Sequence, residues 1–204
     1  LGDAGQVVVI AHDSKSLTSQ ERVNNFIAEI QNNHPNMSVA GPYYMDQIDD
    51  IKKTIAEQQL DIVPVEGQEL DEEQQTALDD AIAQITDEDI YNYILEMNPD
   101  VKGIFATNGD TTMQALTACE GKDMKDVVIM GYDADQEEID AMKDGRIAGM
   151  IVQNPYGMGY ATVVAEARCV LNMGNEANVN TGYTWVTPDN IEDRTVQDIL
   201  YAEK

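Results

Sequence analysis

Short apolar runs alternate with helix-like segments along most of the chain. Three runs, at residues 103–106, 127–130 and 148–152, stop at small or polar residues, and the first two are each followed by a helix-forming segment. This alternation is typical of βαβ units, in which buried parallel strands read as continuous apolar stretches. The pattern therefore predicts an α/β fold, a three-layer αβα lobe with a mostly parallel sheet.

The same pattern places the individual elements. We expect strands at 6–11, 37–40, 101–106, 127–130, 148–152 and 183–186. We expect helices at 18–33, 47–59, 71–84, 87–97, 111–120, 136–144 and 158–172. Thr86 and Asp89 have the spacing of a capping box ahead of the fourth helix. Gly109 and Asp110 are expected to cap the helix that starts at Thr111.

Polar side chains follow the strands. Asn108 and Asp110 come after one predicted strand, Asp133 follows the next, and Gln153 ends the third. Ligands of open α/β sheets bind outside the carboxyl ends of the strands, so these residues belong on one rim. Asp133 has an alternative role as a turn or cap ahead of helix 136–144, and Gln153 has one in hinge hydrogen bonding.

Arg22 lies in the first predicted helix, near the end of the first strand. A cation at such a rim in an acidic protein indicates a ligand role. An ion pair with Glu21 or a neighbouring acid explains it equally well.

Charge narrows the choice of partner. The 204 residues include 38 acidic and 12 basic side chains, for a net charge of −26. Such a surface repels a phosphate backbone, so we expect no nucleic-acid partner, and a neutral or cationic small ligand is favoured.

The acid concentrates between Lys53 and Lys102, where there is no other basic residue. We interpret the region as a solvated pair of inserted helices. A divalent-cation site is the alternative, although the segment lacks the spacing of a calcium loop. Cys119 and Cys169 fall in apolar helical contexts, which favours buried free thiols, and sequence leaves their pairing open.

Motifs for catalysis are missing. The loop at residues 11–16 contains no glycine and matches neither phosphate-binding pattern. Neither a nucleophile elbow nor a metal-ligand spacing of Cys and His occurs. The local motifs therefore give no support to catalysis, and we expect neither an enzyme nor a cofactor.

Four segments carry a resemblance to a known family: 16–22 with Phe26, 99–108, 131–133 and 151–153. In order and placement they resemble the ribose-binding-protein-like, type I periplasmic solute-binding proteins of bacterial sugar transporters. Lac-repressor-type regulators share that ligand-binding fold. The resemblance implies a Rossmann-like lobe, one of two that close by a hinge over a small neutral sugar or polyol.

The resemblance also implies site residues and a cellular setting. Arg22, Asn108, Asp133 and Gln153 would hydrogen-bond sugar hydroxyls, and Tyr132 would stand beside the sugar. The partner would be the membrane permease of an ABC importer. The location would be extracytoplasmic, in the periplasm or on a cell-surface lipoprotein. The alternative is a ligand-sensing domain of a transcriptional regulator or signalling receptor.

Aligned with that family, the chain divides into three parts. Residues 1–153 would form the second, C-terminal lobe, with an acidic insertion at about 60–89. Residues 154–182 would be a crossover that packs on the first lobe in the family, and 183–204 the return strand and tail. Residues 1–3 read like the end of a helix that enters the lobe, so we expect the first lobe to be absent and the chain truncated.

A missing first lobe has a physical consequence for helix 158–172. Its apolar residues, including Ala161, Val164, Ala165 and Val170, would lose their sheet partner, and exposing a helix face is costly. We expect this helix to pack on another copy of the chain or to fold back onto its own lobe.

Overall fold

A computed structural model describes residues 1–2, 4–65, 70–176 and 178–200. Its centre is a six-stranded sheet with the strand order β2-β1-β3-β4-β5-β6. β1 to β5 run parallel, and β6 is antiparallel to β5. The strands are β1 (Ala4–Ala11), β2 (Asn36–Tyr44), β3 (Val101–Ala106), β4 (Val128–Tyr132), β5 (Gly149–Gln153) and β6 (Tyr183–Val186). The prediction of a mostly parallel α/β sheet is confirmed.

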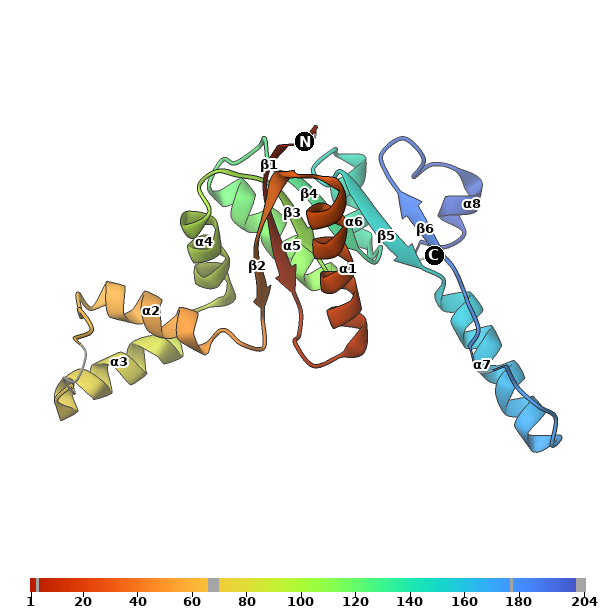
Figure 1. Cartoon of the computed structure of the whole chain (residues 1–204), viewed down its shortest axis with the longest axis horizontal. Helices are drawn as coiled ribbons and strands as arrows, with labels where there is room; N and C mark the ends of the chain where they lie inside the picture. Colours follow the sequence, from red (N-terminus) through yellow and green to blue (C-terminus); the bar gives the residue numbers. More distant parts are fainter. Residues whose placement is uncertain (3, 66–69, 177, 201–204) are drawn as a thin grey trace.

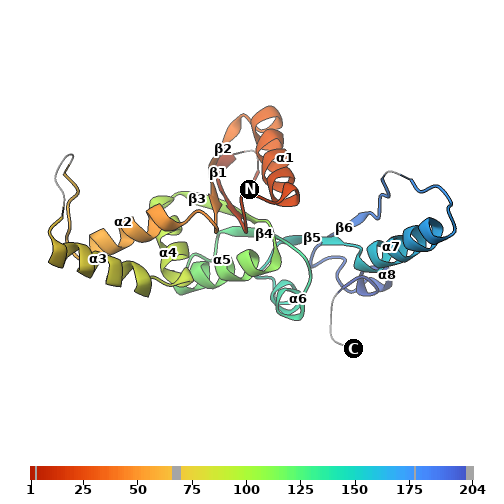
Figure 2. The same cartoon turned by 90° about the horizontal axis from the view of Figure 1, so that it is seen from below.

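Helices cover the sheet on both faces. They are α1 (Leu17–Asn33), α2 (Asp49–Gln59), α3 (Glu72–Gln84), α4 (Asp87–Met97), α5 (Gly109–Gly121), α6 (Gln136–Lys143), α7 (Pro155–Val170) and α8 (Arg194–Gln197). Figure 2 shows α1 on one side of the strands and α4, α5 and α6 on the other. The three predicted layers are therefore present.

The order of the strands reverses beside β1. The chain runs from β1 through α1 to β2 on one side, and later strands add on the other side, starting with β3. Such a switch point, at the carboxyl ends of parallel strands, is where open α/β sheets bind ligands. The loop after β1 and the loop after β3 meet there.

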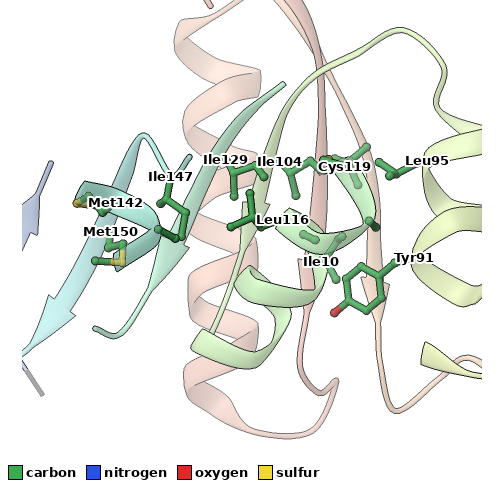
Figure 3. Close-up of a cluster of buried hydrophobic side chains, with 14 of the residues drawn as sticks. Ile10, Tyr91, Leu95, Ile104, Leu116, Cys119, Ile129, Met142, Ile147 and Met150 are labelled. Carbon is green, nitrogen blue, oxygen red and sulfur yellow. The ribbon is translucent and has the colours of Figure 1, made fainter. Parts of the chain in front are cut away.

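The main hydrophobic core lies between the sheet and α4, α5 and α6 (Figure 3). Ile10, Ile104 and Ile129 come from three neighbouring strands, and Leu116 and Met142 come from the covering helices. A smaller cluster on the α1 side includes Val9, Val23 and Phe105. Strands buried on both faces explain why the sequence shows continuous apolar runs rather than alternation.

Two helical arms project from this body (Figure 1). The first consists of α2 and α3, in the acidic region, and places Leu78 between them. The predicted acidic insertion falls largely on this arm, although its residues Glu66 and Glu69 lie outside the described residues. Residues 201–204 of the predicted C-terminal tail also lie outside them. The role of this arm as an insertion stays a prediction.

α7 forms the second arm. It has no buried residue, and Val170 keeps 82% of its surface exposed. Its hydrogen-bond partners are in the returning segment: Asn175 donates to the carbonyl of Ala165, and Arg168 donates to the carbonyl of Gly174. The expectation that this helix folds back onto its own lobe is wrong. The predicted exposure is confirmed for Val164 and Val170, whereas Ala161 and Ala165 are half-buried.

The other differences concern element ends. β2 extends beyond the predicted strand 37–40 and continues through Gly41 and Pro42, because an edge strand can accept proline without losing a ladder bond. α7 starts at Pro155 rather than Met158, since proline suits a first turn and Asn154 caps it. α8 was missed because four residues are too few to show periodicity.

Single residues follow the predictions less evenly. The capping box of Thr86 and Asp89 is present. Both cysteines are free thiols: Cys119 is buried as predicted, whereas Cys169 is exposed because α7 packs on so little.

Candidate ligand-binding site

Asp133 lies at the centre of the predicted rim. Its Oδ1 accepts a hydrogen bond from Gln153 Nε2 at 3.2 Å, and its Oδ2 accepts one from the backbone N–H of Gly109 at 3.3 Å. The ends of β4, β5 and the start of α5 therefore meet at one carboxylate. The helix-cap alternative for Asp133 is wrong, because the N-cap of α6 is Asp135.

Asn108 directly precedes Gly109, whose N–H donates to this carboxylate, but it has a structural task of its own. It is the N-cap of α5: its Oδ1 accepts from the backbone N–H of Thr111 at 3.1 Å and from the Thr111 hydroxyl at 2.6 Å. Our expectation that Gly109 and Asp110 cap this helix is wrong, since both lie inside its first turn. The cap uses Oδ1, so the two donors of Nδ2 are not part of it.

Arg22 reaches the same edge of the sheet from α1. Its Nη1 donates to the carbonyl oxygen of Thr107 at 2.6 Å, and its guanidinium carbon lies 3.8 Å from the centre of the Tyr132 ring. These are its polar partners among the described residues, in place of the ion pair with Glu21. A cation stacked on an aromatic ring keeps its charge while its plane is fixed.

Beside these groups the α1 face of β3–β6 is hollowed. The hollow has a volume of about 750 Å³, and Arg22, Tyr132 and Gln153 contribute to its wall together with Phe105 and Trp185. Asn108 and Asp133 are outside its lining. The structure thus forms two adjoining groups at this edge of the sheet. In one, Asp133 contacts Gln153 and the start of α5. In the other, Arg22 stacks on Tyr132.

A larger hollow, about 920 Å³, lies between α2 and α3 and contains none of the predicted site residues. It is the gap between two helices of a projecting arm, lined by side chains such as Leu78 and Ile82. We place the candidate site at the rim because polar groups from several strand ends converge there.

Sequence reasoning missed the residues that support the rim from below. Thr107 is fully buried, and its hydroxyl accepts from the backbone N–H of His12 at 3.2 Å and lies 3.0 Å from His12 Nδ1. His12 Nε2 in turn lies 3.0 Å from Asp13 Oδ2. The signal was available, because His12 follows β1 and Thr107 follows β3, the strands on either side of the switch point.

The electrostatics of the rim are acidic. Backbone N–H groups of Ser16 and Lys15 lower the pKa of Asp13, which keeps this carboxyl ionised. Behind Asp133, burial raises the pKa of Glu138 to about 8. Within the described ranges, no group of three or more His, Cys, Asp or Glu side chains could hold a metal ion.

Chemically, the rim offers hydrogen-bond donors and acceptors around an aromatic ring. Such a set binds polar molecules.

Over the residues that the structure describes, no helix is long and apolar enough to cross a membrane.

Sequence comparison identifies the family. The profile of the periplasmic binding protein domain matches residues 1–169. The chain belongs to the periplasmic binding protein family. This family consists of solute-binding proteins rather than enzymes, as the sequence predicted.

Curated relatives of this periplasmic binding protein include the ribose import binding proteins of Salmonella typhimurium and Escherichia coli. They are 35% and 33% identical to it over 66 residues, which is 32% of this chain and 22% of each relative. The matched part is thus well under two thirds of either relative.

Solved structures agree on the fold. An ABC transporter solute-binding protein from Agrobacterium vitis with bound D-fucose has a TM-score of 0.72 and 23% identity, covering 98% of this chain and 57% of that one. An arabinose-binding protein from Geobacillus stearothermophilus has a TM-score of 0.64 and 23% identity, covering 93% and 56%. This periplasmic binding protein chain therefore spans a little over half the length of these solved relatives.

Proposed function

We propose that the rim binds a small neutral sugar or polyol through Arg22, Asn108, Asp133 and Gln153, with Tyr132 beside the ligand. The observation that carries the proposal is the convergence on Asp133, where Gln153 and the N-terminus of α5 meet at one carboxylate. The relatives named for ribose, D-fucose and arabinose support a sugar as the ligand class.

The chemistry of the rim suits a polyhydroxylated ligand. A carboxylate has about four lone-pair positions, so Asp133 can accept hydroxyl protons while it keeps its two protein partners. Asn108 contributes donors, and hydrogen bonds to the charged Asp133 and Arg22 are stronger than neutral ones. An aromatic ring such as that of Tyr132 covers the apolar face of a sugar.

We further propose that the chain acts as part of the extracytoplasmic solute-binding component of an ABC importer. In that arrangement residues 1–153 serve as one ligand-binding lobe, 154–182 as the crossover and 183–204 as the return strand and tail. The ligand would be enclosed by hinge closure between two lobes. The relatives named for import favour transport over the sensory alternative.

The sugar site can be tested on the chain itself by titrating its ¹⁵N-labelled form with D-ribose, D-fucose, D-arabinose and D-allose. We expect at least one sugar to shift the Gly109 backbone amide and the Gln153 side-chain amide. Asp133→Asn should abolish those shifts. Asp140→Asn, which removes an exposed carboxylate from the same region, should preserve them. If no sugar moves either signal, or if Asp133→Asn responds like the parent chain, the rim is not the sugar site.

We also propose that α7, when no first lobe packs on it, is an interaction surface for a second copy of the chain. Between Arg146 and Asp189 the charged residues are only Glu166, Arg168 and Glu176. The large apolar side chains that this stretch exposes include Tyr156, Tyr160, Val163, Val170 and Leu171. On a chain with a net charge of −26, two copies can meet along this stretch without bringing many like charges together.

A further inference from the structure

Glu138 is a buried carboxyl group directly behind the rim. It is 1% exposed and is the third residue of α6. Its Oε2 accepts a hydrogen bond from the backbone N–H of Asp135 at 2.9 Å, while its Oε1 has no hydrogen-bond partner within the part of the chain that the structure describes. Most buried polar atoms are paired, so an unpaired one calls for an explanation.

The same carboxyl group packs against Gly109. A Cβ atom at position 109 would lie 3.1 Å from Glu138 Oε2 and 3.4 Å from its Cδ, closer than most such contacts. Gly109 is also the residue whose backbone N–H donates to Asp133. Glu138 therefore touches the group that holds the central carboxylate of the rim, without reaching the ligand position itself.

The charged groups that act on Glu138 are all carboxylates. Asp133 and Asp135 face it from the loop before α6, and Asp110 faces it from the first turn of α5. Burial is the largest effect and raises the pKa of Glu138, the backbone bond from Asp135 lowers it, and the three acids raise it again, to about 8. At neutral pH the group thus carries a proton.

We propose that Glu138 is a proton-carrying positioning residue, whose neutral form holds the Asp133 loop in its ligand-binding conformation, so that affinity at the rim falls as the pH rises. The effect on affinity rests on the proposed sugar site. The link is structural: Asp133 has a left-handed backbone with φ of 75°, and the Asp135 N–H bond to Glu138 fixes the loop that contains it.

Loss of the proton changes this arrangement. A buried negative charge would then lie among three carboxylates with one hydrogen bond to satisfy it, and burying such a charge is costly. Water can reach it only if the start of α6 moves away from Gly109. That movement also displaces the loop that contains Asp133, which lowers the affinity for a ligand.

The test uses the chain without any ligand first. Carbon NMR of the side-chain carboxyls should give Glu138 a midpoint near pH 8, and the Gly109 amide signal should move with the same midpoint. Glu138→Gln should leave the Gly109 signal flat over this range. Glu137→Gln, the same change at the exposed neighbouring position, should behave like the parent chain. A Glu138 midpoint near the ordinary value, or a Gly109 signal that titrates equally in Glu138→Gln, overturns the proposal.

The second part of the test repeats the sugar titration at pH 6.5 and pH 9. If only the protonated form binds, the dissociation constant of the parent chain rises about tenfold at pH 9, whereas that of Glu138→Gln stays constant. Equal pH dependence in both proteins refutes the role of Glu138. Absence of binding by both proteins at both pH values refutes the sugar site, and with it the effect on affinity, while the ligand-free NMR result still decides the positioning.

Discussion

Replacing Glu138 by glutamine should stabilise the protein at neutral pH. The pKa of this carboxyl is about 8 in the folded chain and 4.5 ordinarily. Between these values the folded chain holds a proton that the unfolded chain releases, so the free energy of unfolding falls by about 1.4 kcal/mol per pH unit as the pH rises. The loss accumulated by pH 7 is about 3 kcal/mol, and above pH 8 it levels off.

Glutamine reproduces the shape of the protonated acid and keeps an oxygen for the Asp135 N–H, but it does not titrate. Allowing for relaxation around the site, we expect Glu138→Gln to gain about 2 kcal/mol at pH 7, or roughly 4–8 °C in melting temperature for a chain of this size. Below about pH 4 the gain should vanish, because both states then carry the proton.

Urea unfolding at pH 5, 6, 7, 8 and 9 checks the sign and the window. The difference between Glu138→Gln and the parent chain should grow from pH 5 to pH 8 and then stay constant. Glu137→Gln, which changes an exposed carboxylate, should run parallel to the parent at every pH. Parallel curves for Glu138→Gln and the parent chain would show that Glu138 is ionised in the folded state and that the reasoning is wrong.

Three further predictions concern the cap, the sheet and the arm. Asn108→Ala removes the N-cap of α5 and should cost about 1 kcal/mol in urea unfolding. Gly149→Ala brings a methyl group onto the ring of Trp185, which should shift the emission of this single tryptophan and cost about 1–3 kcal/mol. Gly159→Ala, in open space on α7, should leave that emission unchanged. By analytical ultracentrifugation the parent chain should be a dimer and Val163→Asp a monomer; a monomeric parent at tens of micromolar contradicts the α7 interface.

The pattern of apolar runs sufficed to predict the layers, the parallel sheet and most elements, because strands buried on both faces differ clearly from amphipathic helices. It also placed Asp133 and Gln153 at strand ends, where the structure brings them together. Local pattern could not tell which of Asn108, Gly109 and Asp110 caps α5, because all three suit a helix start. Nor could the pattern single out Glu138, because in the sequence it is one of several acids on an acidic helix. Only the fold shows that this side chain is buried.

The geometry around Asp133 explains how a strained residue can serve as a fixed acceptor. A left-handed backbone costs an aspartate on the order of 1 kcal/mol. Three hydrogen bonds oppose that cost: its N–H donates to the carbonyl of Ile151 at 3.1 Å, and its carboxylate accepts from Gly109 and Gln153. At about 1 kcal/mol each, these bonds outweigh the strain. The carboxylate is therefore held in place by the chain itself, so a ligand at the proposed sugar site would not have to order it.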